Sequence, residues 1–142
     1  MRVFFDASVI IASLLSPSGG SSLLLQYVKI GQLVGIVSQT VITEVTDKKK
    51  SKKVKKTKKE IEEWVEDSGL IVRKAITVAE VKPHEDLIDT DDAHLVAGAR
   101  LTHCTHLVTL DKKHLLRVDI AKKFLPLRIV SPKELLVEII GK

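Results

Sequence analysis

Two aspartates stand where an α/β protein could build a site. Asp6 and Asp111 each follow an apolar run, VFF in one case and HLVTL in the other. In a parallel sheet such residues project from the carboxyl edge, which is where open α/β sheets bind ligands. If the two strands are neighbours, the carboxylates repel each other unless a proton or a cation lies between them. A cation site at this edge is therefore the first chemical possibility.

Two further acids can reach the same edge. Glu44 lies about one turn into a helix predicted for SQTVITEV, and Asp92 begins a helix predicted for DAHLVAGAR. Oxygen ligands around a small open site suit Mg²⁺ or Mn²⁺. With a phosphodiester bound, such ions can activate a water and stabilise the leaving oxygen, so hydrolysis of a phosphodiester is the expected reaction. Taken singly, each acid has a structural alternative, because Asp after a strand is a common N-cap or turn residue.

The elements that must position these acids are visible as apolar runs. Five runs of strand length occupy residues 2–5, 33–37, 70–72, 106–110 and 127–130, and helical patterns separate them. Continuous apolarity indicates strands buried on both faces, and alternation with helices indicates parallel βαβ units. Helix boundaries are predicted at Ser21 or Ser22 as a cap, at Gly31 and Gly69 as stops, and at Ser131 as the cap of the last helix.

Composition sets the class of protein. A chain of 142 residues is expected to form one domain, residues 1–142. Its one cysteine, Cys104, excludes an intrachain disulfide and favours a reducing compartment, with the cytoplasm as the default. The N-terminal apolar stretch is interrupted by Asp6, so neither a membrane span nor a signal peptide is expected. Aromatic residues make up 4% of the chain, so base stacking is not its main tool.

Positive charge is concentrated in a lysine-rich insert at residues 48–59. It holds nine of the 23 basic residues, and removing these nine from the net charge of +5 would leave −4. One interpretation is a surface that tracks a nucleic-acid backbone, and the other is a solvated linker, since blocks of like charge are often disordered. The lysines assigned to nucleic-acid binding are Lys52, Lys53, Lys55 and Lys56, with Lys112 beside Asp111.

The order and spacing of these motifs resemble the PIN-domain ribonucleases, many of which are toxins of toxin–antitoxin pairs. The similar segments are RVFFDASVIIASLLSPSGG, VSQTVITEV, DTDDAHLVAGA, HLVTLDKKHL and IVSPKELL, which together span nearly the whole chain. The resemblance implies a three-layer α/β/α sandwich around a central parallel sheet of about five strands. It also implies an Mg²⁺- or Mn²⁺-dependent endoribonuclease, an antitoxin partner and a homodimer. The lysine-rich insert lies outside the family pattern.

The same resemblance assigns roles to individual residues. Asp6, Asp92 and Asp111 are expected to bind metal and to be catalytic, with Glu44 as a ligand or as the residue that orients the attacking water. In the string Asp89, Asp91, Asp92, the spacing to Ala97 and Ala99 favours Asp92, and Asp91 is the alternative or a supporting residue. Ser8 and Thr109 are each two residues from a proposed ligand, so their hydroxyls are expected to bond a carboxylate, a metal-bound water or phosphate.

Other candidates are weaker. His103, Cys104 and His106 have the spacing of zinc ligands but lack a distant partner pair. His94 is expected to lie away from the metal, and His114 has no assigned role. Two other functions remain possible: a non-catalytic module that binds RNA or protein, and a receiver-type signalling domain. The third apolar run ends in Val72 and is followed by Arg73, with no Asp to accept a phosphoryl group, which disfavours the receiver.

Overall fold

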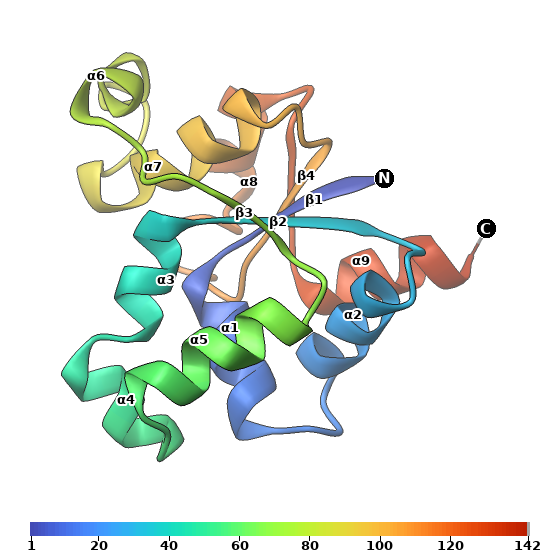
Figure 1. Ribbon diagram of the computed structural model, residues 1–142. Helices are drawn as coiled ribbons and strands as arrows, with labels where there is room; N and C mark the ends of the chain where they lie inside the picture. The colour runs from blue at the N-terminus through green and yellow to red at the C-terminus, as the bar shows by residue number, and fades with distance from the viewer. Residues whose placement is uncertain (142) are drawn as a thin grey trace.

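A five-stranded parallel sheet forms the centre of the protein (Figure 1), and the computed structural model describes residues 1–141. All four strand pairs are parallel, in the order β3-β2-β1-β4-β5. Helices cover both faces, so the predicted three-layer α/β/α architecture is confirmed. The strands are β1 (Arg2–Phe5), β2 (Val34–Ser38), β3 (Ile71–Arg73), β4 (His106–Val108) and β5 (Arg128–Val130).

The helices divide between the two faces of the sheet. Helix α7 packs against β1 and β4 on one face, whereas α1, α2 and α9 pack together on the other (Figure 1). The α-helices are α1 (Ala7–Leu15), α2 (Gly20–Lys29), α3 (Gln39–Val45), α4 (Lys48–Val54), α5 (Lys58–Asp67), α6 (Val78–Val81), α7 (Thr90–Leu101), α8 (Val118–Ala121) and α9 (Pro132–Ile140), and two 3₁₀ turns follow α6 and α8 at η1 (Lys82–His84) and η2 (Lys122–Phe124).

Several predicted boundaries are correct, and one is wrong. Gly31 and Gly69 follow their helices with φ of 82° and 86°, and Ser131 caps α9 in a capping box with Glu134. Ser22, in contrast, lies inside α2, which begins at Gly20 with Gly19 as its cap, and so does Ser21. The Ser22 hydroxyl instead donates to the carbonyl of Ser16 (2.7 Å), just beyond α1. Ser22 therefore stabilises the end of α1, whereas the cap position of α2 is taken by Gly19.

The lysine-rich insert is ordered as α4, a short turn and the start of α5. Asp47 caps α4 by accepting from the amide of Lys49 (3.0 Å), and Val54 is buried at its far end. Lys55 then takes a left-handed conformation, with φ of 56°. Thr57 and Glu60 form the capping box of α5. The segment is therefore helical and not a linker without structure, although most of its lysines are exposed to solvent as the solvated-linker interpretation expected.

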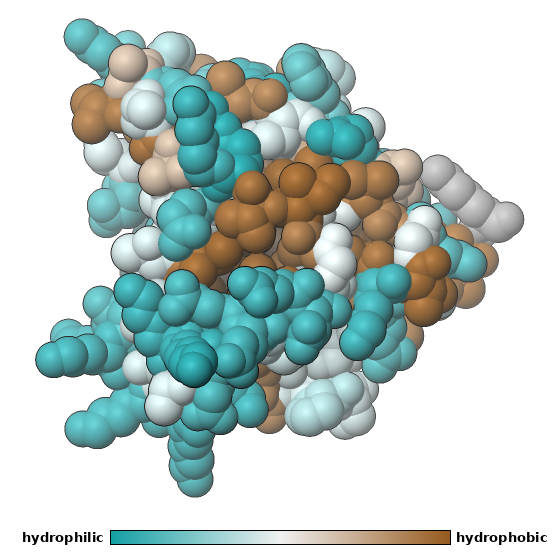
Figure 2. Space-filling view, viewed as in Figure 1, coloured by the Kyte–Doolittle hydropathy of each residue, from teal (hydrophilic) through white to brown (hydrophobic). Residues whose placement is uncertain are grey.

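Hydrophobic residues are exposed on one part of the sheet. Figure 2 shows a hydrophobic band over β2 and β3, where Ile71 and Val72 are 52% and 44% exposed. Within residues 1–141, no single helix is long and apolar enough to cross a membrane. Only α1 and α2 taken together reach that length and hydropathy, as a pair bent by 101°, and both contribute buried side chains to the core.

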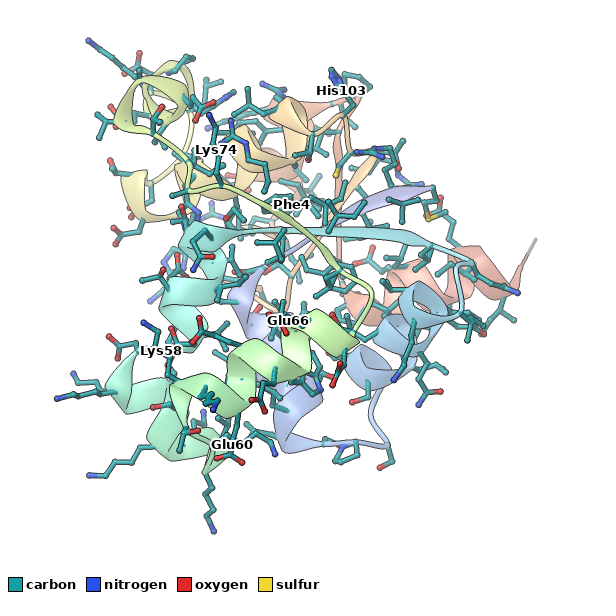
Figure 3. The ribbon with its side chains drawn as sticks, viewed as in Figure 1. Phe4, Lys58, Glu60, Glu66, Lys74 and His103 are labelled. Carbon is teal, nitrogen blue, oxygen red and sulfur yellow. The ribbon has the colours of Figure 1, made fainter. Side chains whose placement is uncertain are left out.

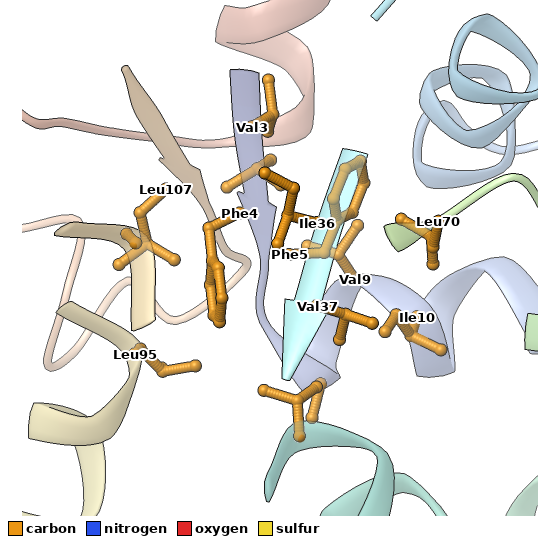
Figure 4. Packing of buried hydrophobic residues seen from close by; sticks show 14 of the residues in the cluster. Val3, Phe4, Phe5, Val9, Ile10, Ile36, Val37, Leu70, Leu95 and Leu107 are labelled. Carbon is orange, nitrogen blue, oxygen red and sulfur yellow. The ribbon is translucent and has the colours of Figure 1, made fainter. Parts of the chain in front are cut away.

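The spacing between β1 and α7 is set by Phe4 and Gly98. Phe4 is fully buried beside Leu95 and Leu107 (Figure 4). A Cβ placed on Gly98 would lie 2.6 Å from Cζ of the Phe4 ring, which is closer than atoms can approach. A glycine is therefore required here for close packing of the helix on the sheet.

We expect Gly98→Ala to lower the free energy of unfolding by about 1–2 kcal/mol, because overpacking costs about 1–3 kcal/mol and the better helix propensity of Ala returns only part of it. The matched control is Gly20→Ala, whose Cβ would make an ordinary 3.4 Å contact with Leu136. Urea denaturation of both variants checks this, and equal stability of the two would contradict it.

Candidate metal centre

Asp6 is the innermost acid of the site and is held by two hydroxyls. It follows β1 and is 7% exposed. Ser8 Oγ donates to Asp6 Oδ2 (2.9 Å), and so does Thr109 Oγ1 (2.7 Å). The Asp6 side chain does not cap α1, so the N-cap interpretation does not account for it. Both hydroxyls use Oδ2, which leaves Oδ1 as the oxygen that can bind a cation.

The same two hydroxyls tie Asp6 to the loop that carries Asp111. Ser8 Oγ accepts from the amide of Leu110 (3.1 Å), and Thr109 Oγ1 accepts from the amide of Asp111 (3.1 Å). Strands β1 and β4 are neighbours, with Phe5 opposite Val108, as the repulsion argument assumed. Each hydroxyl thus bridges a carboxylate on one strand to the backbone beyond the next.

Asp111 lies in a tight turn that also brings in a histidine. Its Oδ1 accepts from the amide of His114 (2.9 Å), and its Oδ2 lies 3.1 Å from His114 Nδ1. Ligand atoms of Asp92, Asp111 and His114 all lie within 4.8 Å of one another. In the described part of the chain this is the one group of acids, cysteines or histidines close enough to share a metal ion. Sequence reasoning gave His114 no role, although a residue three positions after a turn aspartate is placed to contact it.

Asp92 is the acid of the site whose pKa is raised. It is the third residue of α7, which begins at Thr90 and is capped by Asp89, rather than the first residue of its helix. Burial, together with the negative charges of Asp111 and Asp6, raises the pKa of Asp92 to about 6. A cation near these carboxylates would oppose this rise, because it favours their ionised forms. The donor set of carboxylates and one imidazole fits a divalent ion.

Glu44 also lies at the site, but its carboxylate is paired with a histidine. Its Oε1 lies 2.7 Å from Nε2 of His94, so His94 faces Glu44 instead of pointing away from the acids. His94 is 8% exposed, and its Nδ1 is buried with no hydrogen-bond partner within residues 1–141. This pairing draws Glu44 toward α7. Asp6 and Glu44 both line the cleft but lie outside the compact group of Asp92, Asp111 and His114.

The four acids share one cleft of about 570 Å³. Asp91 does not line it and is exposed in the first turn of α7. Of the lysines assigned to nucleic-acid binding, Lys53 lines the cleft. Lys50, which had no role assigned from the sequence, lines it as well. The complete lining is Asp6, Ala7, Ser8, Ile11, Ala12, Leu15, Glu44, Lys50, Lys53, Asp92, Leu110 and Asp111.

The other candidates lie elsewhere. Lys112 lines a groove beside α9, and His103 is exposed, at the opposite end of the molecule from Lys58 (Figure 3). Cys104 Sγ contacts the Thr102 hydroxyl (3.3 Å), and His106 Nε2 lies 3.2 Å from Glu138. The spacing of His103, Cys104 and His106 therefore does not produce a shared metal site.

Comparison with known proteins decides the family. A family model described as the PIN domain matches residues 2–113, which include all four acids of the cleft. The chain belongs to the PIN-domain family. PIN domains are generally nucleases that use divalent metal ions, and the acidic cluster at the sheet edge agrees with this.

Two solved structures share the fold of this PIN domain. The crystal structure of PAE2754 from Pyrobaculum aerophilum aligns with a TM-score of 0.64 at 15% identity, covering 100% of this chain and 91% of that one. VapBC2 from Rickettsia felis, solved bound to a DNA fragment from its promoter, aligns with a TM-score of 0.62 at 14% identity, covering 92% and 98%. At these identities the likeness is one of fold alone. A search of curated proteins finds no match.

The pKa of Asp92 predicts a pH-dependent stability. Because the folded-state value is raised to about 6, the folded chain holds a proton that the unfolded chain releases between about pH 4 and 6. Asp92 therefore destabilises the metal-free PIN domain increasingly as pH rises through this window. We expect Asp92→Asn to be more stable than wild type at pH 7 by about 1 kcal/mol, a figure discounted for partial exposure, and nearly equal at pH 4. Urea denaturation in chelator at both pH values checks this; an unchanged difference between them would contradict it.

The hydroxyl bridge predicts a role for Thr109 in metal binding. Thr109→Val removes the bonds to Asp6 and to the Asp111 amide, so we expect Mn²⁺ affinity to fall about 10–100-fold, as when partners of metal ligands are lost. The matched control is Thr105→Val, whose hydroxyl donates to the Arg2 carbonyl (3.0 Å) at the other end of β4. Calorimetric titration of both variants with Mn²⁺ checks this, and equal affinities would refute the role.

Proposed function

We propose that this PIN domain is a metal-dependent endoribonuclease that hydrolyses RNA phosphodiester bonds. The observation that carries the proposal is the convergence of Asp6, Asp92 and Asp111 at the carboxyl edge of the sheet, where the pKa of Asp92 is raised to about 6. Acids that repel each other in a defined cleft are suited to binding Mg²⁺ or Mn²⁺ together with a substrate phosphate.

The residues divide the work as follows. Asp6, Asp92 and Asp111 would hold the divalent ion, and Ser8 and Thr109 fix the orientation of Asp6. A bound ion would supply Lewis acidity at the phosphate and lower the pKa of a water. Glu44, at the cleft but outside the compact group, orients that water or adds a ligand oxygen. No protein nucleophile is required, because a water can attack the phosphate.

The biological setting is proposed from the family. The aligned Rickettsia felis protein is part of VapBC2, solved on a promoter DNA fragment, and PIN domains include toxins of toxin–antitoxin pairs. We therefore propose that this chain is the toxin of such a pair, acts in the cytoplasm, forms a homodimer, and is neutralised by a small antitoxin near the acidic cleft. Expression of the chain alone should arrest growth. Co-expression with the product of a neighbouring gene should relieve the arrest, and that product should co-purify with the chain.

A non-catalytic RNA-binding module is the alternative function. The ordered, exposed lysines of α4 favour it, because they supply positive charge whether or not the acids bind metal. The two functions differ in their response to the acids: binding by a non-catalytic module does not require metal and yields no cleavage products.

We expect Asp6→Asn and Asp111→Asn each to reduce Mn²⁺-dependent RNA cleavage by about 100-fold or more, since losing only the partners of metal ligands costs about 10–100-fold. The matched control is Asp86→Asn, an exposed acid outside the cleft, which should keep full activity. Cleavage of a labelled RNA with and without a chelator measures this. Undiminished cleavage by both cleft variants would exclude the proposed site, and no cleavage by wild type would favour the binding module.

A further inference from the structure

The lysine-rich insert presents two separate surfaces. At about 100° per residue, Lys50 and Lys53 lie about 60° apart on one flank of α4, at about 40° and 100° from the buried Val54. Lys48 and Lys52 fall on the opposite side. The first pair lines the cleft that contains the four carboxylates, whereas Lys48, Ser51, Lys52, Lys55, Lys56, Thr57 and Glu60 line a shallow depression of about 530 Å³ elsewhere. Lysines that are neighbours in the sequence therefore lie on two different surfaces of the protein.

The position of α4 is fixed at both ends. Asp47, three residues after Glu44, caps the helix, and Val54 anchors its end in the core. Helix α4 packs against α1 and α3, the helices that carry the other residues on its side of the cleft. Figure 2 shows hydrophilic side chains gathered over α4 and α5. Lys50 and Lys53 therefore belong to a wall of the cleft and are not parts of a mobile tail.

Neither lysine neutralises the acids that it faces. Across residues 1–141, no ion pair involves Lys50 or Lys53, and the cleft carboxylate Glu44 pairs with His94 instead. Exposed lysines beside carboxylates, left without a protein partner, are available to an anion that enters the cleft. The acids alone would repel a polyanion, so the cleft needs positive charge to accept one.

The rest of the lining indicates how such an anion is recognised. No aromatic side chain lines the cleft, so bases have no stacking platform there. Lysine is a compact point charge, which binds a phosphate without reading base edges. The chemistry of the wall therefore fits the phosphodiester backbone of a nucleic acid, independent of its sequence.

We propose that Lys50 and Lys53 bind backbone phosphates of a nucleic-acid strand beside the phosphate that occupies the acidic end of the cleft, and that the outward lysines do not contribute to this binding. The proposal rests on the proposed function for the position of the reacting phosphate. It adds Lys50 to the binding residues assigned from the sequence, keeps Lys53, and removes Lys52, Lys55 and Lys56 from the substrate path.

The test compares two double variants with the same change in charge. Lys50→Gln/Lys53→Gln removes the cleft pair, and Lys52→Gln/Lys55→Gln removes an outward pair. Binding of the full chain to a fluorescein-labelled 12-nucleotide oligouridylate, and to the oligodeoxyuridylate of the same length, is measured by anisotropy in chelator over a series of salt concentrations. Far-ultraviolet circular dichroism and urea midpoints confirm that both variants fold.

We expect the cleft pair to lower the magnitude of the log–log salt slope by about 1.4, since each phosphate contact on a single strand contributes about 0.7. Affinity at low salt should fall at least about tenfold, equally for the RNA and the DNA strand, and Lys50→Arg/Lys53→Arg should retain the wild-type slope. The outward pair should leave the slope unchanged. Equal losses from both pairs, a loss from the outward pair alone, or no binding by wild type would overturn the proposal.

Cleavage assays separate this proposal from the proposed function. With Mn²⁺ present, the cleft pair should raise KM about tenfold or more and change kcat little. If wild type binds as expected but does not cleave, the proposed nuclease activity fails and the phosphate-binding wall stands. If wild type cleaves but the cleft pair leaves the salt slope unchanged, the nuclease stands and the wall fails.

Discussion

Mutual repulsion among Asp6, Asp92 and Asp111 is the constraint on which the rest of this structure depends. Burying Asp92 beside two other carboxylates costs stability, and its raised pKa reflects first its burial and then the negative charges of Asp111 and Asp6. The fold holds them together by two means. Hydroxyls of Ser8 and Thr109 lock Asp6 to the β4 edge, and the close contact between Gly98 and Phe4 sets α7, which carries Asp92, against the sheet. A divalent ion bound there would offset the repulsion between the carboxylates.

The sequence predicted the parts of this arrangement that depend on local pattern. The bounds of β1 are correct, and the other four strands were placed to within two residues at each end, because buried parallel strands read as continuous apolar runs. Capping at Ser131 and the helix ends at Gly31 and Gly69 were correct, since these depend on local backbone conformation. The position of Asp92 rather than Asp91 in the cleft follows from the cap at Asp89, which sets the rotation of the helix.

Features that depend on distant contacts were not predictable. His94 pairs with Glu44 on another helix, and Ser22 satisfies the carbonyl of Ser16 at the end of α1 instead of capping α2, contacts that only the folded chain defines. The lysine-rich insert was the largest difference. Its like charges suggested disorder, but the cap at Asp47 and the burial of Val54 outweigh their repulsion and make a helix. The orientation of this helix places Lys50 and Lys53 at the cleft and Lys52 away from it, although these lysines look equivalent in the sequence.

The hydrogen bond from Thr109 to Asp6 joins residues 103 positions apart. A nascent chain therefore carries Asp6, Glu44 and Asp92 well before it carries the strand and turn that complete their cleft. During synthesis the acids are separated from their last partner, and loop closure over this distance is among the slower steps of folding. If the chain cleaves RNA, an incomplete chain on the ribosome would be inactive, because it lacks Thr109 and Asp111 and so cannot complete the acidic cleft.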